Sequence, residues 1–319
     1  MDKEIQDFLQ QVRESGRAAY WQGTPESARA RPTLMQALFG PAPQVARTEE
    51  LAFRSADGTR VGARLYVPPS ETLSEPGSLI VYFHGGGWVV GSVEGYHPFN
   101  ADLARRTGCA VLAVDYRLAP EHPFPLPLQD AVAALEFAAA NACAWLGGEP
   151  EALIAFGDSA GAALATMAAR EHNASGCRRV DLQVLVYPIC DVRFDTGSYE
   201  TYQQGFLLTR RDMQWFWDLY CPDRRVREAG QCAPMQQDRL AGSPNALIVT
   251  AECDPLRDEG EAYAARLREH GVPAELIRGD GLVHGFLSMV HWSPSAGNVY
   301  AQIVERIKRA ATRGSAASA

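Results

Sequence analysis

Hydrophobic residues gather in short, nearly continuous runs from about residue 78 onward. Six such runs are rich in Val, Ile, Leu and Phe, and they span residues 78–84, 109–116, 152–156, 181–188, 245–252 and 274–279. A run that is apolar at almost every position is typical of a strand buried on both faces, because a half-buried strand alternates apolar and polar residues. We therefore predict six buried strands.

Between these runs lie segments with helical patterning, near residues 98–107, 128–142, 160–173, 255–270 and 298–312. Strands that alternate with helices predict a parallel sheet covered by helices on both faces, which is an α/β fold. Upstream, the Asp57-Gly58 pair separates two strand-like runs within residues 49–68, and such a pair favours a hairpin. We expect these two strands to be antiparallel strands at the edge of the same sheet.

Two segments do not follow this alternation. The first 45 residues predict one or two amphipathic helices, with Ile5, Phe8, Leu9 and Val12 at helical spacing. Residues 192–235 interrupt the strand pattern with an aromatic helix whose start at Thr209 and Asp212 resembles a capping box. Ligands of open α/β sheets sit at the carboxyl ends of the strands, so inserted helices there predict a lid, with simple core packing as the alternative.

This organisation divides the chain into five predicted parts. They are N-terminal cap helices (1–45), a first core part (46–190), an inserted cap segment (191–235), a second core part (236–313) and a disordered tail (314–319).

Composition excludes several classes of protein. The net charge of −8 and scattered basic residues argue against a nucleic-acid surface. The charged N-terminus lacks the apolar core of a signal peptide, and no run approaches the ~18 apolar residues of a membrane span. The seven cysteines are odd in number and show no CxxC spacing, which favours free thiols over a disulfide framework or a zinc site. We expect a cytoplasmic protein without a metal or cofactor.

The stretch "EALIAFGDSAGAA" (151–163) carries the first candidate for chemistry. Gly157 and Gly161 bracket Ser159 as G-x-S-x-G between a predicted strand and a predicted helix. This context is that of a nucleophile elbow, in which a strained turn projects a serine hydroxyl beside a helix N-terminus. The Ala160 N–H and the helix dipole would then favour a developing oxyanion. A glycine-rich turn without chemistry is the alternative.

A second motif, "HGGGWVVG" (84–91), directly follows a predicted strand. Consecutive glycines let backbone N–H groups face inward, and by position Gly85 and Gly86 are the candidate donors to an oxyanion. A phosphate-binding loop is the competing interpretation. It is disfavoured because the chain has neither GK[ST] nor a GxGxxG that opens a helix with an acid ~20 residues on.

A serine hydroxyl needs a base to take its proton and an acid to orient that base. Of the seven histidines, His284 follows the last predicted strand in a loop at the same sheet edge as Ser159, so it is the candidate base. His84 belongs to the glycine loop and is expected to brace it.

The orienting acid is expected between the serine and the histidine in the chain. Asp254, directly after the strand at 245–252, is the first candidate. Asp191 is its competitor one strand earlier, and Asp258 and Asp280 are weaker candidates. Asp158, beside the serine, is expected to be structural.

Five motifs in order carry a resemblance to a known family: "HGGGWVVGS", "DYRLAPEHPFP", "GDSAGA", "DPLRDEG" and "HGF". Over residues 45–290 the chain resembles the hormone-sensitive-lipase family of bacterial carboxylesterases. The resemblance implies an α/β-hydrolase fold with a mostly parallel eight-stranded sheet and a helical cap built from the N-terminus and the insert. It also implies a Ser159–His284–Asp254 triad and an oxyanion hole from Gly85, Gly86 and Ala160.

The resemblance further implies short acyl esters as substrates, no metal, and frequent dimers, which makes a homodimer a candidate assembly. One departure is that the family's elbow commonly ends in Gly-Gly where this chain has Gly161-Ala162. Because the tight turn needs only the first of these glycines, we expect the extra methyl group to matter little.

Several aromatic residues and a leucine are candidates for the wall of a small apolar pocket, or for ordinary core: Trp88, Phe206, Leu207, Trp215 and Phe216. A small pocket predicts acyl chains of about two to eight carbons. The main alternative to an enzyme is a ligand receptor on a hydrolase fold, but such receptors can lack the histidine that His284 supplies. Amides, lactones and acyl transfer to acceptors other than water remain open.

Overall fold

The computed structural model describes residues 1–30, 38–73, 77–176 and 178–312. Within them, eight strands form one sheet in the order β1-β2-β4-β3-β5-β6-β7-β8. The strands are β1 (Arg47–Arg54), β2 (Arg60–Val67), β3 (Leu79–Phe83), β4 (Ala110–Asp115), β5 (Leu153–Asp158), β6 (Leu182–Val186), β7 (Asn245–Cys253) and β8 (Ala274–Val283). Strand β2 pairs antiparallel with β1 and β4, and every other pair is parallel. The predicted α/β class and mostly parallel sheet are confirmed.

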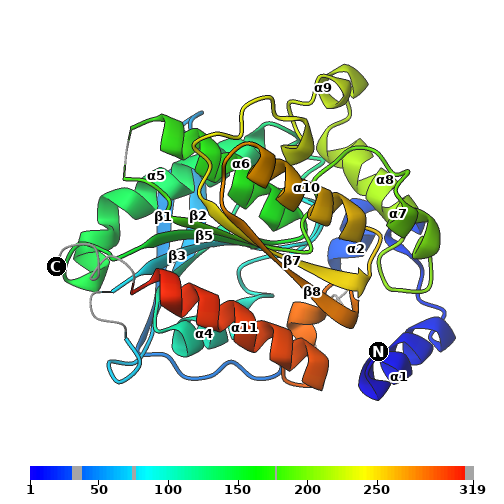
Figure 1. Cartoon of the computed structure of the whole chain (residues 1–319), viewed down its shortest axis with the longest axis horizontal. Coiled ribbons are helices and arrows are strands. Elements are labelled where there is room, and N and C mark those ends of the chain that lie inside the picture. The colour runs from blue at the N-terminus through cyan, green and yellow to red at the C-terminus, as the bar shows by residue number, and fades with distance from the viewer. Residues whose placement is uncertain (31–37, 74–76, 177, 313–319) are drawn as a thin grey trace.

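Helices cover both faces of the sheet (Figure 1). Helices α4 (His97–Thr107) and α11 (Pro294–Ala310) lie on one face, and α5 (Leu126–Leu146), α6 (Ala160–Ala174) and α10 (Arg257–Glu269) lie on the other. Each of the five predicted helices is present, with ends that differ from the prediction by at most a few residues. The hairpin signal at Asp57-Gly58 is also borne out, because β1 and β2 pair across it.

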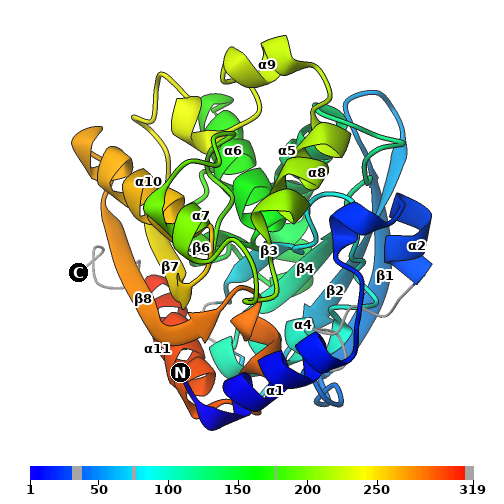
Figure 2. The same cartoon turned by 90° about the vertical axis from the view of Figure 1, so that its right-hand side faces the viewer.

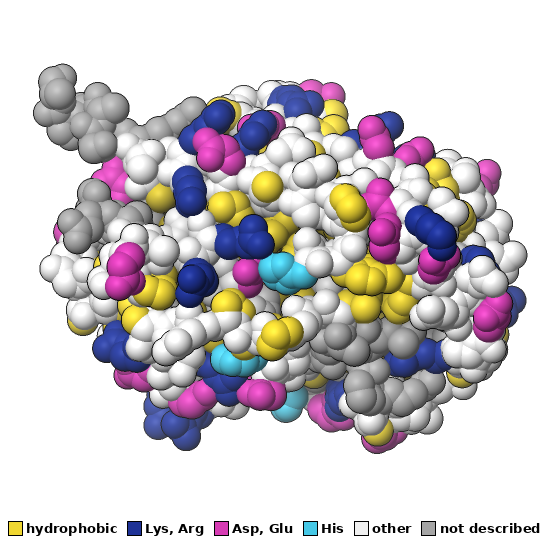
Figure 3. Space-filling view, turned by 90° about the horizontal axis from the view of Figure 1, so that it is seen from below, with side chains coloured by type: hydrophobic (Ala, Val, Ile, Leu, Met, Phe, Trp, Pro, Cys, Tyr) yellow, Lys and Arg dark blue, Asp and Glu magenta, His cyan; other side chains and the backbone are white. Residues whose placement is uncertain are grey.

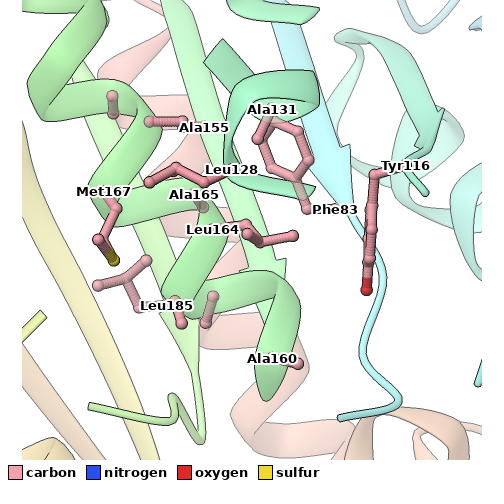
Figure 4. Packing of buried hydrophobic residues seen from close by; sticks show 14 of the residues in the cluster. Phe83, Tyr116, Leu128, Ala131, Ala155, Ala160, Leu164, Ala165, Met167 and Leu185 are labelled. Carbon is pink, nitrogen blue, oxygen red and sulfur yellow. The ribbon is translucent and has the colours of Figure 1, made fainter. Parts of the chain in front are cut away.

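The central strands are buried on both faces, as their continuous apolar sequence requires. Every residue of β3 and β5 is buried. Helix α6 approaches the sheet closely because its inner face carries small or flexible side chains, which pack against neighbouring strands in Figure 4 (Ala160, Leu164, Ala165 and Met167). This close packing holds the first turn of α6 rigidly against the end of β5.

The segments outside the alternation gather at one end of the sheet (Figure 2). They comprise α1 (Lys3–Glu14), η1 (Tyr20–Gln22) and α2 (Pro25–Ala30) from the N-terminus, and α7 (Gly197–Thr201), α8 (Arg210–Tyr220), α9 (Arg224–Glu228) and η2 (Pro234–Gln236) from the insert. The two groups contact each other, since Asp212 in the capping box of α8 accepts a hydrogen bond from the Trp21 N–H (3.1 Å). The predicted disordered tail lies outside the described residues.

Acidic and basic side chains are interspersed on the face drawn in Figure 3. Among the described helices, none combines the length and apolar character that crossing a membrane requires.

Candidate active site

Ser159 lies at the turn between β5 and α6, with φ 54° and ψ −119°. A positive φ is strained for a residue with a side chain, and the tight packing around the turn holds it there. A Cβ on Gly157 would lie 2.2 Å from the Gly161 carbonyl oxygen, and a Cβ on Gly161 would lie 2.0 Å from the Phe83 carbonyl oxygen. The G-x-S-x-G spacing is therefore a steric requirement here, whereas Ala162 is accommodated in the core.

The structure brings together the three residues that the sequence singled out. Nε2 of His284 lies 3.0 Å from Oγ of Ser159, and Nδ1 of His284 lies 2.8 Å from Oδ2 of Asp254. Because a carboxylate only accepts, Nδ1 carries the proton and Nε2 presents its lone pair to the serine hydroxyl. The arrangement can therefore withdraw a proton from Oγ.

Asp254 is fully buried, and its second oxygen accepts the Leu256 N–H at 2.9 Å. The competing acids are engaged elsewhere. Asp191 pairs with Arg193, and Asp258 accepts the Ser198 N–H. In the described chain, Asp254 is the carboxylate hydrogen-bonded to His284, and the Leu256 N–H fixes its other oxygen.

The glycine loop corrects one part of the predicted oxyanion site. The Gly85 N–H donates to Oδ1 of Asp158 at 2.8 Å, so the structure contradicts its assignment as an oxyanion donor. Within the described residues, the N–H groups of Gly86 and Gly87 donate to no protein acceptor, and both glycines line the same cavity as Ser159. Gly86, the third glycine Gly87, and the first amide of α6, at Ala160, are the donors that remain.

His84 braces this loop, as predicted. Its buried ring stacks on Tyr116 with ring centroids 4.4 Å apart, and its Nδ1 lies 2.7 Å from the Gly85 carbonyl oxygen. Burial lowers the pKa of His84, so the ring is neutral and Nδ1 donates to that carbonyl. The neutral ring of His84 therefore helps to hold the glycine loop in place.

A cavity of about 350 Å³ opens at Ser159 and His284. Of the five candidate wall residues, Leu207 and Phe216 line it, but Trp88, Phe206 and Trp215 do not. The wall also contains apolar side chains that the sequence did not single out for this role. They come from α1, η1, the residue before α4, the loop after β6, and α8 with the residues just before it (Leu9, Val12, Tyr20, Tyr96, Ile189, Leu208 and Met213).

The three residues that do not reach the cavity each pack elsewhere. Trp88 is wholly buried and stacks on Tyr220, with ring centroids 4.0 Å apart. Trp215 stacks on Tyr20, and Phe206 packs edge-on against Tyr202. An aromatic run shows that a segment is apolar but not which of its residues face a ligand.

No group of three or more His, Cys, Asp or Glu side chains is placed to hold a metal ion in the described parts of the chain. A serine, an imidazole and a buried carboxylate in series, beside free backbone amides at the carboxyl edge of a parallel sheet, define a serine hydrolase of the α/β-hydrolase class.

Comparisons with known proteins agree with this class. A family model described as alpha/beta hydrolase fold matches residues 80–288. The ethyl acetate hydrolase of Pseudomonas putida is 34% identical over 82% of each chain, and the arylesterase of Saccharolobus solfataricus is 32% identical over 90% of this chain and 92% of its own. The solved structure of a hyperthermophilic esterase from the archaeon Pyrobaculum calidifontis has a TM-score of 0.88 at 32% identity, covering 97% of this chain and 98% of that chain. The chain belongs to the α/β-hydrolase family, in its hormone-sensitive-lipase-like branch, as its motifs predicted.

Proposed function

We propose that the protein hydrolyses carboxylic esters of short acyl chains, with Ser159 as nucleophile, His284 as general base and Asp254 as the acid that orients the base. The protein is a carboxylic ester hydrolase, and the relatives reported above are named as ester hydrolases. The observation that carries the residue assignment is the hydrogen-bonded series from Oγ to Nε2 and from Nδ1 to Oδ2, at 3.0 and 2.8 Å.

The geometry supports a two-stage reaction. Oγ of Ser159 attacks the ester carbonyl carbon while Nε2 of His284 takes the hydroxyl proton. The tetrahedral intermediate collapses, the carbon–oxygen bond to the alcohol breaks, and the imidazolium gives that alcohol its proton. Water then attacks the acyl-enzyme with the same base, and the acid is released with Ser159 restored.

The reaction also requires groups that stabilise the negative charge that develops on the carbonyl oxygen. We assign its stabilisation to the N–H groups of Gly86, Gly87 and Ala160, since Gly85 is engaged with Asp158. Amides fixed in place before the reaction do not need to reorganise as charge develops, which is why such donors are effective. The N-terminus of α6 adds a positive dipole end at the same point.

Substrate size follows from the cavity. Its volume of about 350 Å³ is near the small end of the usual range for ligand sites, and its wall is mainly apolar. Side chains between residues 9 and 20 and between 205 and 216 contribute much of that wall, so we assign the segments that hold them, 1–45 and 191–235, to a cap that shields the reaction from water. We expect acyl chains of about two to eight carbons to be preferred over long-chain triglycerides.

Ser159→Ala tests the function. With p-nitrophenyl butyrate as substrate, kcat should fall on the order of 10³-fold or more, while the fold is retained. Ser175→Ala, at the opposite end of the same helix, is the matched control and should keep wild-type kcat. A folded Ser159→Ala protein with more than about a tenth of wild-type activity would refute the assignment.

A fluorophosphonate probe gives an independent readout that needs no substrate. Peptide mapping should place the label on Ser159 in the wild-type protein, because only an activated serine reacts rapidly. Label on another serine, or none, would contradict the proposal.

The homodimer and the cytoplasmic location stay predictions. Light scattering coupled to size-exclusion chromatography would check the homodimer.

A further inference from the structure

The residue before the nucleophile, Asp158, carries a carboxyl group that the triad does not use. It is buried, with 3% of its surface exposed, and it is one of the residues that line the active-site cavity. Four donors from separate parts of the chain reach its two oxygens: the Tyr82 hydroxyl (2.6 Å), the Gly85 N–H (2.8 Å), and the Tyr96 and Tyr187 hydroxyls (3.4 Å each).

So many donors on one buried acid need an explanation, because burial of a carboxyl group is costly unless its bonds are made. Burial raises the pKa of Asp158, and the hydrogen bonds from Tyr82 and Gly85 oppose that rise. A core that needed only to be filled would be served by an apolar side chain here. The partners of this carboxyl group indicate what it does instead.

One partner belongs to the oxyanion loop. Gly85 directly precedes Gly86 and Gly87, and its N–H bond to Asp158 fixes where the loop begins. The Gly85 backbone and the Asp158 carboxyl group are packed closely, since a Cβ on Gly85 would lie 2.4 Å from Oδ2 of Asp158. If the carboxyl group were removed, the loop would lose its anchor on the side of the nucleophile.

Another partner contacts the catalytic base. The ring of Tyr187 packs against the ring of His284 with centroids 4.7 Å apart, and its hydroxyl is the one that reaches Oδ2 of Asp158. Tyr187 has φ +36°, a strained value for a bulky residue, and its N–H bonds to the Val249 carbonyl at 2.6 Å. Strain of this kind persists only where surrounding contacts impose it, and Asp158 supplies one of them.

We propose that Asp158 is a positioning residue that fixes both halves of the active site, the oxyanion loop through the Gly85 N–H and the His284 ring through Tyr187. It does not touch the reacting atoms. The inference rests on the proposed ester hydrolysis and adds to it a residue outside the triad whose carboxyl group sets the distance between oxyanion donors and base.

The test compares Asp158→Ala, Asp158→Asn and wild type in hydrolysis of p-nitrophenyl butyrate. Misplacing catalytic groups by about 1 Å can cost 10²-fold, so Asp158→Ala should lower kcat by about 10- to 100-fold with KM changed by less than about threefold. Asp158→Asn keeps an oxygen that can accept from Gly85 and Tyr82, so it should recover at least about a third of the wild-type kcat.

Binding of butylboronic acid, which adds to an active-site serine and imitates the tetrahedral intermediate, is the second readout. Its inhibition constant should rise with Asp158→Ala by about the factor that kcat falls, because both depend on the oxyanion donors. Inhibition by butanol, which forms no tetrahedral adduct, should change by less than about threefold. Parallel weakening of both inhibitors would show a general disruption and overturn the proposal.

Asp130→Asn is the matched control. Asp130 is also buried and hydrogen-bonded, to Arg117, but it does not line the cavity. The Asp130→Asn substitution should lower the melting temperature and leave kcat unchanged. The proposal is wrong if folded Asp158→Ala keeps kcat within about threefold of wild type.

If Asp158→Ala fails to fold, Tyr187→Phe decides the matter. Tyr187→Phe keeps the ring on His284 and removes the hydroxyl that meets Asp158, so kcat should fall by about two- to tenfold at constant KM. Wild-type kcat in folded Tyr187→Phe would overturn the proposal. Failure of the proposed function itself would appear separately, as a wild-type protein that neither hydrolyses the ester nor reacts with fluorophosphonate.

Discussion

Nε2 of His284 lies 3.0 Å from Oγ of Ser159, although 125 positions separate the two residues in the chain. Ser159 follows β5 and His284 follows β8, and two strands, β6 and β7, lie between them in the sheet. Parallel strands end at a common edge, so residues that directly follow strands are brought together whatever their separation in sequence. The contact is therefore a consequence of strand order, and its precision depends on the rigid packing of β5, β8 and α6.

Asp254→Asn should reduce kcat on the order of 10³- to 10⁴-fold, because the amide no longer fixes the productive tautomer of His284. The matched variants are Asp191→Asn and Asp258→Asn, which alter acids that contact Arg193 and Ser198 instead. Steady-state kinetics with one ester should separate them, since both controls are expected to keep wild-type kcat to within about threefold. A loss in Asp191→Asn equal to that in Asp254→Asn would reassign the acid.

Gly87→Ala should impair the oxyanion site sterically. The new Cβ would lie 2.2 Å from Cδ1 of Phe216, so the loop or the ring must move. We expect kcat to fall by about 10-fold or more, and Phe216→Ala in the same chain should restore part of it by making room. Gly58→Ala is the control, since Gly58 also has a positive φ (82°) but open space around it, and it should keep full activity. Absence of any rescue would argue against this clash as the cause.

The course of the strands and the meeting of Ser159, His284 and Asp254 could be predicted because both leave local signals. Buried strands are continuously apolar, and a residue directly after such a strand lies at a known edge of the sheet. The oxyanion donors could not be predicted as well, because three consecutive glycines look alike in sequence. The hydrogen bond that the Gly85 N–H donates to Asp158 is what removes Gly85 from that set.

The residues of the pocket wall were also poorly predicted from the sequence, because the sequence does not show which way a side chain points. Trp88 and Phe216 are both large aromatic residues near a loop or helix of the site, but Trp88 stacks on Tyr220 inside the core and Phe216 faces the cavity. Orientation of that kind is decided by tertiary packing. The partners of Asp158 likewise come from positions 82, 96 and 187, with no spacing that would link them in advance.

Phe216→Ala should shift the preferred acyl length upward, because removal of the ring enlarges the cavity beside Ser159. The ratio of kcat/KM for the p-nitrophenyl octanoate to that for the acetate should rise by about 5-fold or more, in line with about 1 kcal/mol or more of apolar contact. Trp215→Ala, at the neighbouring position but outside the cavity wall, should leave that ratio unchanged. An equal shift in both variants would mean that the whole helix α8 had moved.

The Arg29–Glu121 pair predicts a pH-dependent contribution to stability. The Arg29 guanidinium donates to both oxygens of Glu121 (2.8 and 2.7 Å) and to the carbonyls of Val89 and Ala119, which ties α2 to the glycine loop. It thereby lowers the pKa of Glu121 to about 2. A depressed carboxyl pKa stabilises the folded state above the unfolded value of about 4.3, and this contribution is lost as pH falls through about 2.

Glu121→Gln should therefore lower the free energy of unfolding near pH 7 by up to about 1 kcal/mol, the range for a partly exposed pair. The difference from wild type should shrink as the pH falls below about 4.3. Urea unfolding at a series of pH values measures this difference. Glu71→Gln is the control, because Glu71 is exposed and forms no ion pair with the described residues. A difference that stays constant or grows on acidification would show that Glu121 acts through packing and not through its charge.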